Sequence, residues 1–210
     1  TGLGSQALFS NTTAIGNTAV GYKASYANTT GTNNTAVGRD SLLTATTASD
    51  NVAVGREAMK RATTGHSNTG IGTEALKETT TGAYNTAVGN DALLSNTTAN
   101  SNVSVGYQSL YSNTTGAKNS VLGTNALDAN TTGANNVAVG FEALTSNTTA
   151  SHNTAVGYQA GYVNTAQQGT FIGEQAGYSN TTGLGNTFVG SDSGYLNTTG
   201  TRNQFFGKNS

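Results

Sequence analysis

The sequence predicts an all-β fold, a parallel β-solenoid in which seventeen-residue coils stack on one another. Three observations predict it. A glycine recurs at a fixed interval, the residues around it repeat in columns, and every repeat holds a short segment rich in β-branched residues between turn-forming residues. A repeat this short cannot bury its apolar side chains alone, whereas stacked parallel coils cover one another.

The recurring residue is called the motif glycine below. It follows a large apolar residue in each repeat, and successive motif glycines differ by seventeen positions, with a single interval of sixteen between Gly157 and Gly173. This regularity extends along nearly the whole chain and therefore indicates one tandem array. The motif glycines are Gly4, Gly21, Gly38, Gly55, Gly72, Gly89, Gly106, Gly123, Gly140, Gly157, Gly173, Gly190 and Gly207.

Other columns of the repeat are nearly as constant as the motif glycine. Asparagine stands four residues before it from Asn17 to Asn203, except that the shortened repeat has Gly169. Alanine or serine stands three residues after it, and threonine stands eight residues after it from Thr12 to Thr198. The consensus reads N-T-A-V-G-x-x-A-L-x-x-N-T-T-G-x-x.

The first element of each repeat is an extended segment over the N-T-A-V residues, for example 85–88. β-Branched residues suit a pleated strand. Alternation places the second residue and the valine on one face of the strand and the alanine on the other. The motif glycine then turns the chain, and the N-T-T-G residues form a second turn or short strand.

The middle of the repeat, x-x-A-L-x-x, is ambiguous. Residues 56–61 and 73–78 have the local pattern of one helical turn, whereas 107–111 reads better as a strand. We expect extended structure with a possible helical turn.

Stacked coils bring equivalent side chains into vertical ladders, and asparagine side chains hydrogen-bond to one another along such a ladder. This stacking explains the asparagine and threonine columns. The predicted ladder residues in three successive repeats are Asn85, Gly89, Thr97, Asn102, Gly106, Thr114, Asn119, Gly123 and Thr131.

The side chains in two columns of the repeat change size together along the chain. Early repeats have alanine before the valine and mostly leucine four residues after the motif glycine, whereas late repeats have phenylalanine in the first column and glycine in the second. Cores tolerate exchanges that keep their summed volume. We therefore expect both columns in one core layer, with the exchange at Phe171, Phe188, Phe205, Gly161, Gly177 and Gly194.

Composition excludes several classes of protein. The net charge of −1 gives no electrostatic footprint for nucleic acid, and no apolar run is long enough to cross a membrane, so we expect neither nucleic-acid binding nor membrane contact in this segment. The 210 residues contain no cysteine. We expect residues 1–210 to be one tandem-repeat domain of about 12 repeats, cut from a longer array because both ends fall within a repeat.

The N-T-A-V-G motif followed by x-x-A resembles the head repeats of trimeric autotransporter adhesins and the shaft repeats of phage tail fibres. The likeness extends from Gly4 to Gly207, although the repeats of that family are usually a few residues shorter than the repeats of this chain. The resemblance implies a homotrimer of left-handed parallel β-rolls, extracellular, at a cell surface or on a virion, that serves as an adhesive head or a spacer.

Four acidic residues occupy one column, two residues after the motif glycine in successive repeats: Asp40, Glu57, Glu74 and Asp91. Stacking would bring like charges close together, which costs energy. A cation site and the carboxylate pair of a retaining glycosidase are the functional alternatives. We expect instead a solvated face relieved by Arg39, Arg56, Lys60, Arg61 and Lys77, with no catalytic residue, metal or cofactor.

The remaining motifs are weaker. His66 and His152 have no second ligand at metal-binding spacing, and 70–75 mimics a dinucleotide fingerprint only because of the repeat. Tyrosines recur in two columns, where they stack on sugars or cover seams between coils or copies. The N-T-T asparagines match the glycosylation sequon at Asn11, Asn28, Asn96, Asn113, Asn130, Asn147, Asn180 and Asn197.

We therefore predict a non-enzymatic extracellular fibre segment, either a tail-fibre shaft or an adhesin head. Its predicted partner is itself, in a homotrimer or a filament, and host-surface glycans or proteins are further candidates. Two alternatives stay open: the subunit of a self-assembling extracellular filament, and an ice-binding β-solenoid whose threonine column from Thr12 to Thr198 lies on a flat face.

Overall fold

A computed structural model describes all 210 residues and shows an all-β chain of short parallel strands without any helix. The parallel β-solenoid with one repeat per coil is thereby confirmed. The chain divides into two compact units, Thr1–Asn102 (unit 1) and Val103–Ser210 (unit 2), where the repeat alone predicted a single domain. Each unit consists of the same kind of coil.

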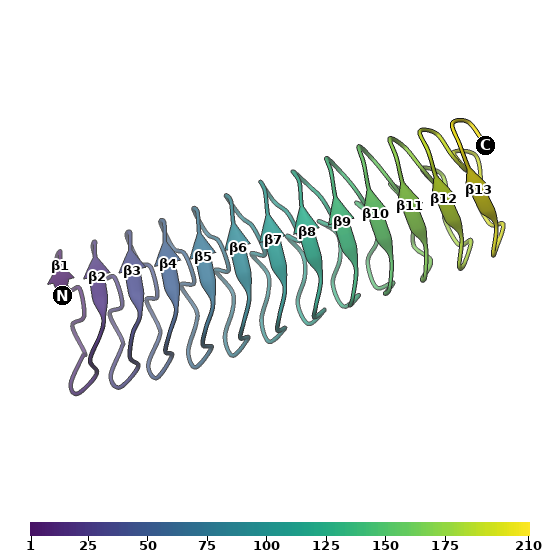
Figure 1. Cartoon of the computed structure of the whole chain (residues 1–210). Coiled ribbons are helices and arrows are strands. Elements are labelled where there is room, and N and C mark those ends of the chain that lie inside the picture. The colour runs from purple at the N-terminus through teal and green to yellow at the C-terminus, as the bar shows by residue number, and fades with distance from the viewer. The chain divides into compact units, whose positions relative to one another are not determined.

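Unit 1 contains six strands that pair in sequence order, all parallel. Each residue pairs with the residue one repeat later, so Ala36 lies beside Ala53 and Val37 beside Val54. Figure 1 shows each strand followed by a loop that returns to the start of the next strand. The strands are β1 (Gly2–Leu3), β2 (Thr18–Val20), β3 (Thr35–Val37), β4 (Val52–Val54), β5 (Thr69–Ile71) and β6 (Thr86–Val88).

Unit 2 repeats this arrangement with seven parallel strands. The shortened repeat keeps the register, because Ala155 of one strand still pairs with Phe171, the middle residue of the next strand. The lost residue is therefore taken from the loop and not from the strand. The strands are β7 (Val103–Val105), β8 (Ser120–Leu122), β9 (Val137–Val139), β10 (Thr154–Val156), β11 (Thr170–Ile172), β12 (Thr187–Val189) and β13 (Gln204–Phe206).

The motif glycine ends each strand in a conformation that other residues rarely adopt. Gly21 has a φ of 132°, and a Cβ atom placed on it would lie 2.7 Å from the carbonyl oxygen of Gly38 in the next coil. Neither the dihedral angle nor the close approach of the two backbones admits a side chain. The glycine column is therefore a requirement of coil stacking.

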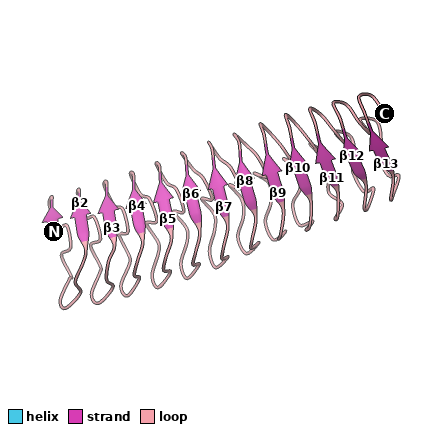
Figure 2. Ribbon diagram, in the orientation of Figure 1, coloured by secondary structure: helices cyan, strands magenta, loops and turns pink.

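The possible helical turn in the middle of the repeat is wrong, and so is the strand reading of 107–111. Both segments are turns, and Figure 2 draws only strands and loops. In 56–61, Glu57 and Met59 have positive φ values of 58° and 50°. Their N–H groups bond to neighbouring coils, from Glu57 to the Arg39 carbonyl and from Met59 to the Ala75 carbonyl, each at 2.9 Å. Bonds between coils thus alternate with short-range bonds such as that from the Lys60 N–H to the Glu57 carbonyl at 3.2 Å, and the continuous i to i−4 series of a helix does not form.

The interior of each coil is narrow. The middle residue of nearly every strand is buried, and it is usually alanine. Leucine four residues after the motif glycine is buried in the same coils, as Leu93 and Leu144 are. The first and third residues of each strand face outward, so the larger apolar residue of the strand lies outside the core.

The late repeats fill the same interior differently. A Cβ atom on Gly161 would lie 2.7 Å from the Phe171 ring, and one on Gly177 would also clash with that ring. The two exchanged columns therefore share one core layer. The Phe171 ring also explains Gly169, which replaces the column asparagine, because a Cβ atom there would lie 2.5 Å from the ring.

Candidate functional site

Two asparagine ladders connect the coils, and their side chains are buried. Asn68 donates from Nδ2 to the Gly82 carbonyl oxygen at 2.8 Å, and its Oδ1 accepts from the backbone N–H and the Nδ2 of Asn85 at 2.9 and 3.1 Å. Asn85 bonds in the same way to the Ala99 carbonyl and to the N–H of Asn102. In unit 2, Asn119 accepts from the Asn136 N–H and donates to the Gly133 carbonyl.

The asparagines of the N-T-T motif form the second ladder, and this arrangement removes the glycosylation reading. Asn28 and Asn130 have no exposed surface. The Nδ2 of Asn130 donates to Asn113 Oδ1 at 2.8 Å and to the Gly133 carbonyl at 3.0 Å. An acceptor asparagine must present its amide nitrogen at the surface, so these sequons are structural.

The threonine column lies on bends and not on a strand. Thr80 donates its hydroxyl to the Thr97 carbonyl oxygen at 3.1 Å, and Thr114 donates to Thr131 at the same distance. Thr131 continues the ladder to Thr148. These hydroxyls therefore connect each coil to the next along the column.

The acidic column of unit 1 is an ion-pair network. Lys77 Nζ lies 2.9 Å from Glu57 Oε2 and 3.0 Å from Glu74 Oε2, and Arg56 Nη2 lies 2.7 Å from Glu74 Oε1. Lys60 and Arg39 also contact Glu57 at 3.4 Å. The cation of each coil thus reaches the carboxylates of two coils and offsets their mutual repulsion.

The electrostatics of this network favour the charged form of both glutamates. Hydrogen bonds from Lys77 hold the pKa of Glu57 and of Glu74 below the ordinary value of 4.5, although burial acts in the opposite direction. Those two carboxylates raise the pKa of Lys77 above 10.5. A glycosidase pair needs one protonated carboxyl group near neutral pH, and neither glutamate provides it.

The other two acidic residues of the column lie beside this network. Asp40 lies 3.7 Å from Arg39, and Asp91 continues the column as a partly exposed side chain. Arg61 pairs with Glu78 at 2.9 Å and takes no part in relieving the column. No group of three or more histidine, cysteine, aspartate or glutamate side chains is placed to hold a metal ion.

The outward side chains of the strands form a surface that we call the outer face. It consists of the first and third residue of each strand, which are mainly threonine and valine, and it contains no charged residue. In unit 2, Val103 and Leu122 are 44% and 53% exposed. Ile71 in unit 1 and Ile172 in unit 2 are exposed as well. Alternation in the sequence separated the two faces of the strand, but it did not show that valine lies outside.

A second surface, which we call the side wall, consists of the residues one, two and five positions after each motif glycine. These columns touch one another, as Arg56, Glu57 and Lys77 show in unit 1. In unit 2 the same columns carry stacked aromatic rings and amides, which the sequence indicated only as recurring tyrosines. Tyr162, Tyr178 and Tyr195 stack with centroid distances of 5.0 and 5.1 Å.

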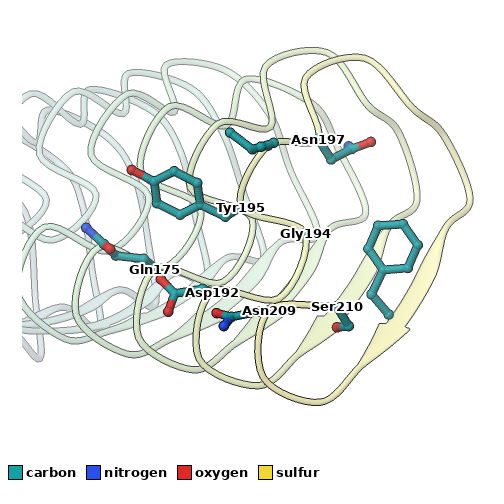
Figure 3. Close-up of a pocket in the computed structure, with 9 residues that line it drawn as sticks. Gln175, Asp192, Gly194, Tyr195, Asn197, Asn209 and Ser210 are labelled. Atoms are coloured by element: carbon teal, nitrogen blue, oxygen red, sulfur yellow. The ribbon is translucent and has the colours of Figure 1, made fainter.

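A pocket of about 540 Å³ adjoins this wall at the last coil of unit 2. Figure 3 shows the side chains of Gln175, Asp192 and Asn209 on successive coils, with the Tyr195 ring on the same side. Ser210 forms part of the lining. Its lining combines amide, carboxylate and hydroxyl groups with the Tyr195 and Phe205 rings.

None of the comparisons with family models, curated proteins and solved structures gives a match. The structure contains no helix that could cross a membrane.

Proposed function

We propose that the chain is a non-catalytic segment of an extracellular fibre or adhesin, at a cell surface or on a virion, whose copies associate through the outer face. The outer face carries this proposal. Soluble monomers rarely expose contiguous apolar surface, and larger patches mark interaction sites. Here valine, isoleucine and leucine recur at the third strand position in coil after coil, with threonine or valine beside them.

The occupant that fits the outer face is a second copy of the same chain. The face is uncharged in unit 1 and in unit 2, so an identical face meets it without burying an unpaired charge. Closed symmetric assemblies use the same patch on each copy. Three copies are the number that the resemblance to trimeric adhesins implies, and a trimer would cover the valine columns of all of them.

The interior supports a structural role. The asparagine and threonine side chains are engaged between coils, and the acidic residues of unit 1 are ion-paired. Polar groups that would serve catalysis in another protein are thus used here to hold coils together. Further coils of the same kind can be added to such a stack, which suits a spacer or fibre.

Sedimentation velocity tests the proposal. We expect a discrete species at three times the chain mass of 21.2 kDa. Val139→Lys places a charge on the outer face of β9 and should yield monomers, because burying an unpaired ammonium costs several kcal/mol. Thr132→Lys adds the same charge at an exposed bend and should leave the assembly intact.

Other results would redirect the proposal. A distribution that grows with concentration would indicate the open filament, since heterologous contacts do not close. A monomeric wild-type chain would refute association through the outer face. Thermal hysteresis by that monomer would favour ice binding, with the Thr-x-Val strand face, and not the bonded threonine column, as the surface responsible.

A further inference from the structure

The side wall varies in composition along the chain, whereas the residues that hold the coil together stay constant. The motif glycine, the buried asparagines and the core alanines continue through both units because the coil needs them. In unit 1 the first two coils carry Phe9 stacked on Tyr26, and the following coils carry paired charges such as Arg56 and Glu74. In unit 2 the side wall is occupied by aromatic rings and amides. In repeat proteins, variation on one face of an otherwise constant scaffold is typical of a binding surface.

The aromatic part of the unit 2 side wall consists of two stacks. Tyr162, Tyr178 and Tyr195 lie with their rings within 9° of parallel, and Phe141 stacks on Tyr158 at 5.6 Å. Each stacked ring covers the face of its neighbour, so a ligand meets ring edges and a row of phenolic hydroxyls. The row repeats once per coil. Phe141 and Tyr158 remain 43% and 48% exposed.

An amide ladder runs along the same wall. Gln159 donates from Nε2 to Glu142 Oε2 at 2.8 Å, and Gln175 donates from Nε2 to Gln159 Oε1 at 3.0 Å. A primary amide has two N–H groups and two acceptor lone pairs, so each glutamine keeps hydrogen-bonding capacity for a ligand. Asp192 follows in the same column and accepts from the Ser191 hydroxyl at 3.0 Å.

The two aromatic stacks and the ladder lie close together. Burial, the neighbouring tyrosines Tyr162, Tyr195 and Tyr158, and the Glu142 carboxylate raise the pKa of Tyr178. Tyr158 and Gln159 are consecutive residues, so the Phe141–Tyr158 stack and the amide ladder occupy the same coils. This matches unit 1, where the corresponding columns are in direct contact.

We propose that the side wall of unit 2 binds a neutral linear polysaccharide along the direction in which its coils stack. Sugars need many hydrogen-bond partners together with contact to their C–H groups, and this wall offers phenolic hydroxyls, amides and aromatic edges. The 5.0 and 5.1 Å spacing of the tyrosines is close to the length of one pyranose unit in an extended β-linked chain. The inference deepens, and rests on, the adhesive role proposed above.

The charge of the wall selects the class of polymer. From 107 to 195 the charged residues in these columns are all acidic (Asp128, Glu142, Glu174 and Asp192), and Lys208 in the last coil is the one basic residue of the wall in unit 2. Like charges disfavour a wrong partner, so uronate-rich and sulfated polysaccharides are repelled. The acidic side chains accept hydrogen bonds from the hydroxyls of a neutral chain.

Affinity electrophoresis of the full chain in native gels tests this inference. Hydroxyethylcellulose and galactomannan are the neutral probes, and polygalacturonate and heparin are the anionic ones. We expect a neutral probe to retard the wild-type chain. Tyr178→Phe keeps the stack and removes one hydroxyl, which should weaken binding about two- to tenfold. Tyr178→Ala opens the stack and should abolish the retardation, whereas Tyr84→Ala in unit 1 should not change it.

Several outcomes overturn the inference: no retardation by either neutral probe, retardation only by the anionic probes, or equal retardation of the wild type and of both Tyr178 variants. Sedimentation of the same variants separates this inference from the assembly. Loss of the trimer in Tyr178→Phe would show that the side wall is an interface between copies, whereas an intact trimer without retardation removes only the polysaccharide.

Discussion

Replacing one ladder asparagine should cost more stability than an alanine substitution at most buried polar positions. Asn68 is buried and makes four side-chain hydrogen bonds: Nδ2 to Asn51 Oδ1 at 3.2 Å, Nδ2 to the Gly82 carbonyl at 2.8 Å, and Oδ1 from the N–H and Nδ2 of Asn85 at 2.9 and 3.1 Å. At about 1 kcal/mol for each bond, Asn68→Ala should lower the free energy of unfolding by about 4 kcal/mol.

The ladder distributes this loss over neighbouring coils. In Asn68→Ala the carbonyl of Gly82 and the N–H of Asn85 lose their partners inside the coil, where no solvent replaces them. Hydrogen exchange of the Asn85 amide should therefore accelerate more than exchange of amides several coils away, because repeat proteins couple mainly to their neighbours. Urea unfolding followed by circular dichroism gives the overall change.

The control is Thr81→Ala, an exposed threonine in the same unit, for which we expect a change within about 0.5 kcal/mol. A loss of less than about 1 kcal/mol for Asn68→Ala, with unchanged exchange at Asn85, would contradict the view that the asparagine ladder holds the coils together.

Three further predictions follow from the core and the charges. Phe188→Ala should lower the free energy of unfolding in urea by about 3–5 kcal/mol. Adding Gly194→Leu should recover most of this loss, since other coils are filled by alanine together with leucine. A double variant no more stable than the single one would argue against a shared core layer. The Glu57, Glu74 and Lys77 network should stabilise the fold between about pH 4.5 and 10.5. This stabilisation should fall when acid protonates the glutamates, whose pKa is lowered, or when base deprotonates the lysine, whose pKa is raised. The melting temperature of Lys77→Met should therefore fall less steeply with acid than that of the wild type, and an identical acid dependence would rule the network out as its cause. Burial raises the pKa of Asp128, so its charged form is disfavoured in the fold; Asp128→Asn should raise the melting temperature at pH 7 by the equivalent of roughly 1 kcal/mol or less, and a lower melting temperature would contradict this.

The sequence carried enough information to predict the stacking of coils, because a strict period has one simple physical explanation. It also placed Ala87 and Val88 on opposite faces of a strand. It did not show which face is buried, since valine is the more apolar residue. The structure decides this: Ala87 and Leu93 are fully buried together with the ladder asparagines, and Val121 takes the alanine position in one coil of unit 2.

Local sequence patterns did not predict the backbone conformation where contacts with neighbouring coils determine it. Residues 56–61 have a helical composition, but Glu57 and Met59 adopt positive φ so that their N–H groups reach adjacent coils. Gly169 was an unexplained exception to the asparagine column until the position of the Phe171 ring was known. The tyrosine columns were visible in the sequence, whereas the amide ladder beside them depends on side-chain distances that no spacing supplies.

The placement of valine outside and asparagine inside links the fold to the proposed function. A solenoid with valine in its core would need no partner, and its polar columns would face water. In this chain the buried polar groups of the ladder are matched from coil to coil, as between Asn51 and Asn68, which makes each coil specific for the next one. Much of the apolar surface of the strands then remains outside, at Val103 and Leu122 for example. Coil-to-coil bonding thus supplies the register along the chain, and in the proposed assembly burial of the outer face would supply the free energy for association.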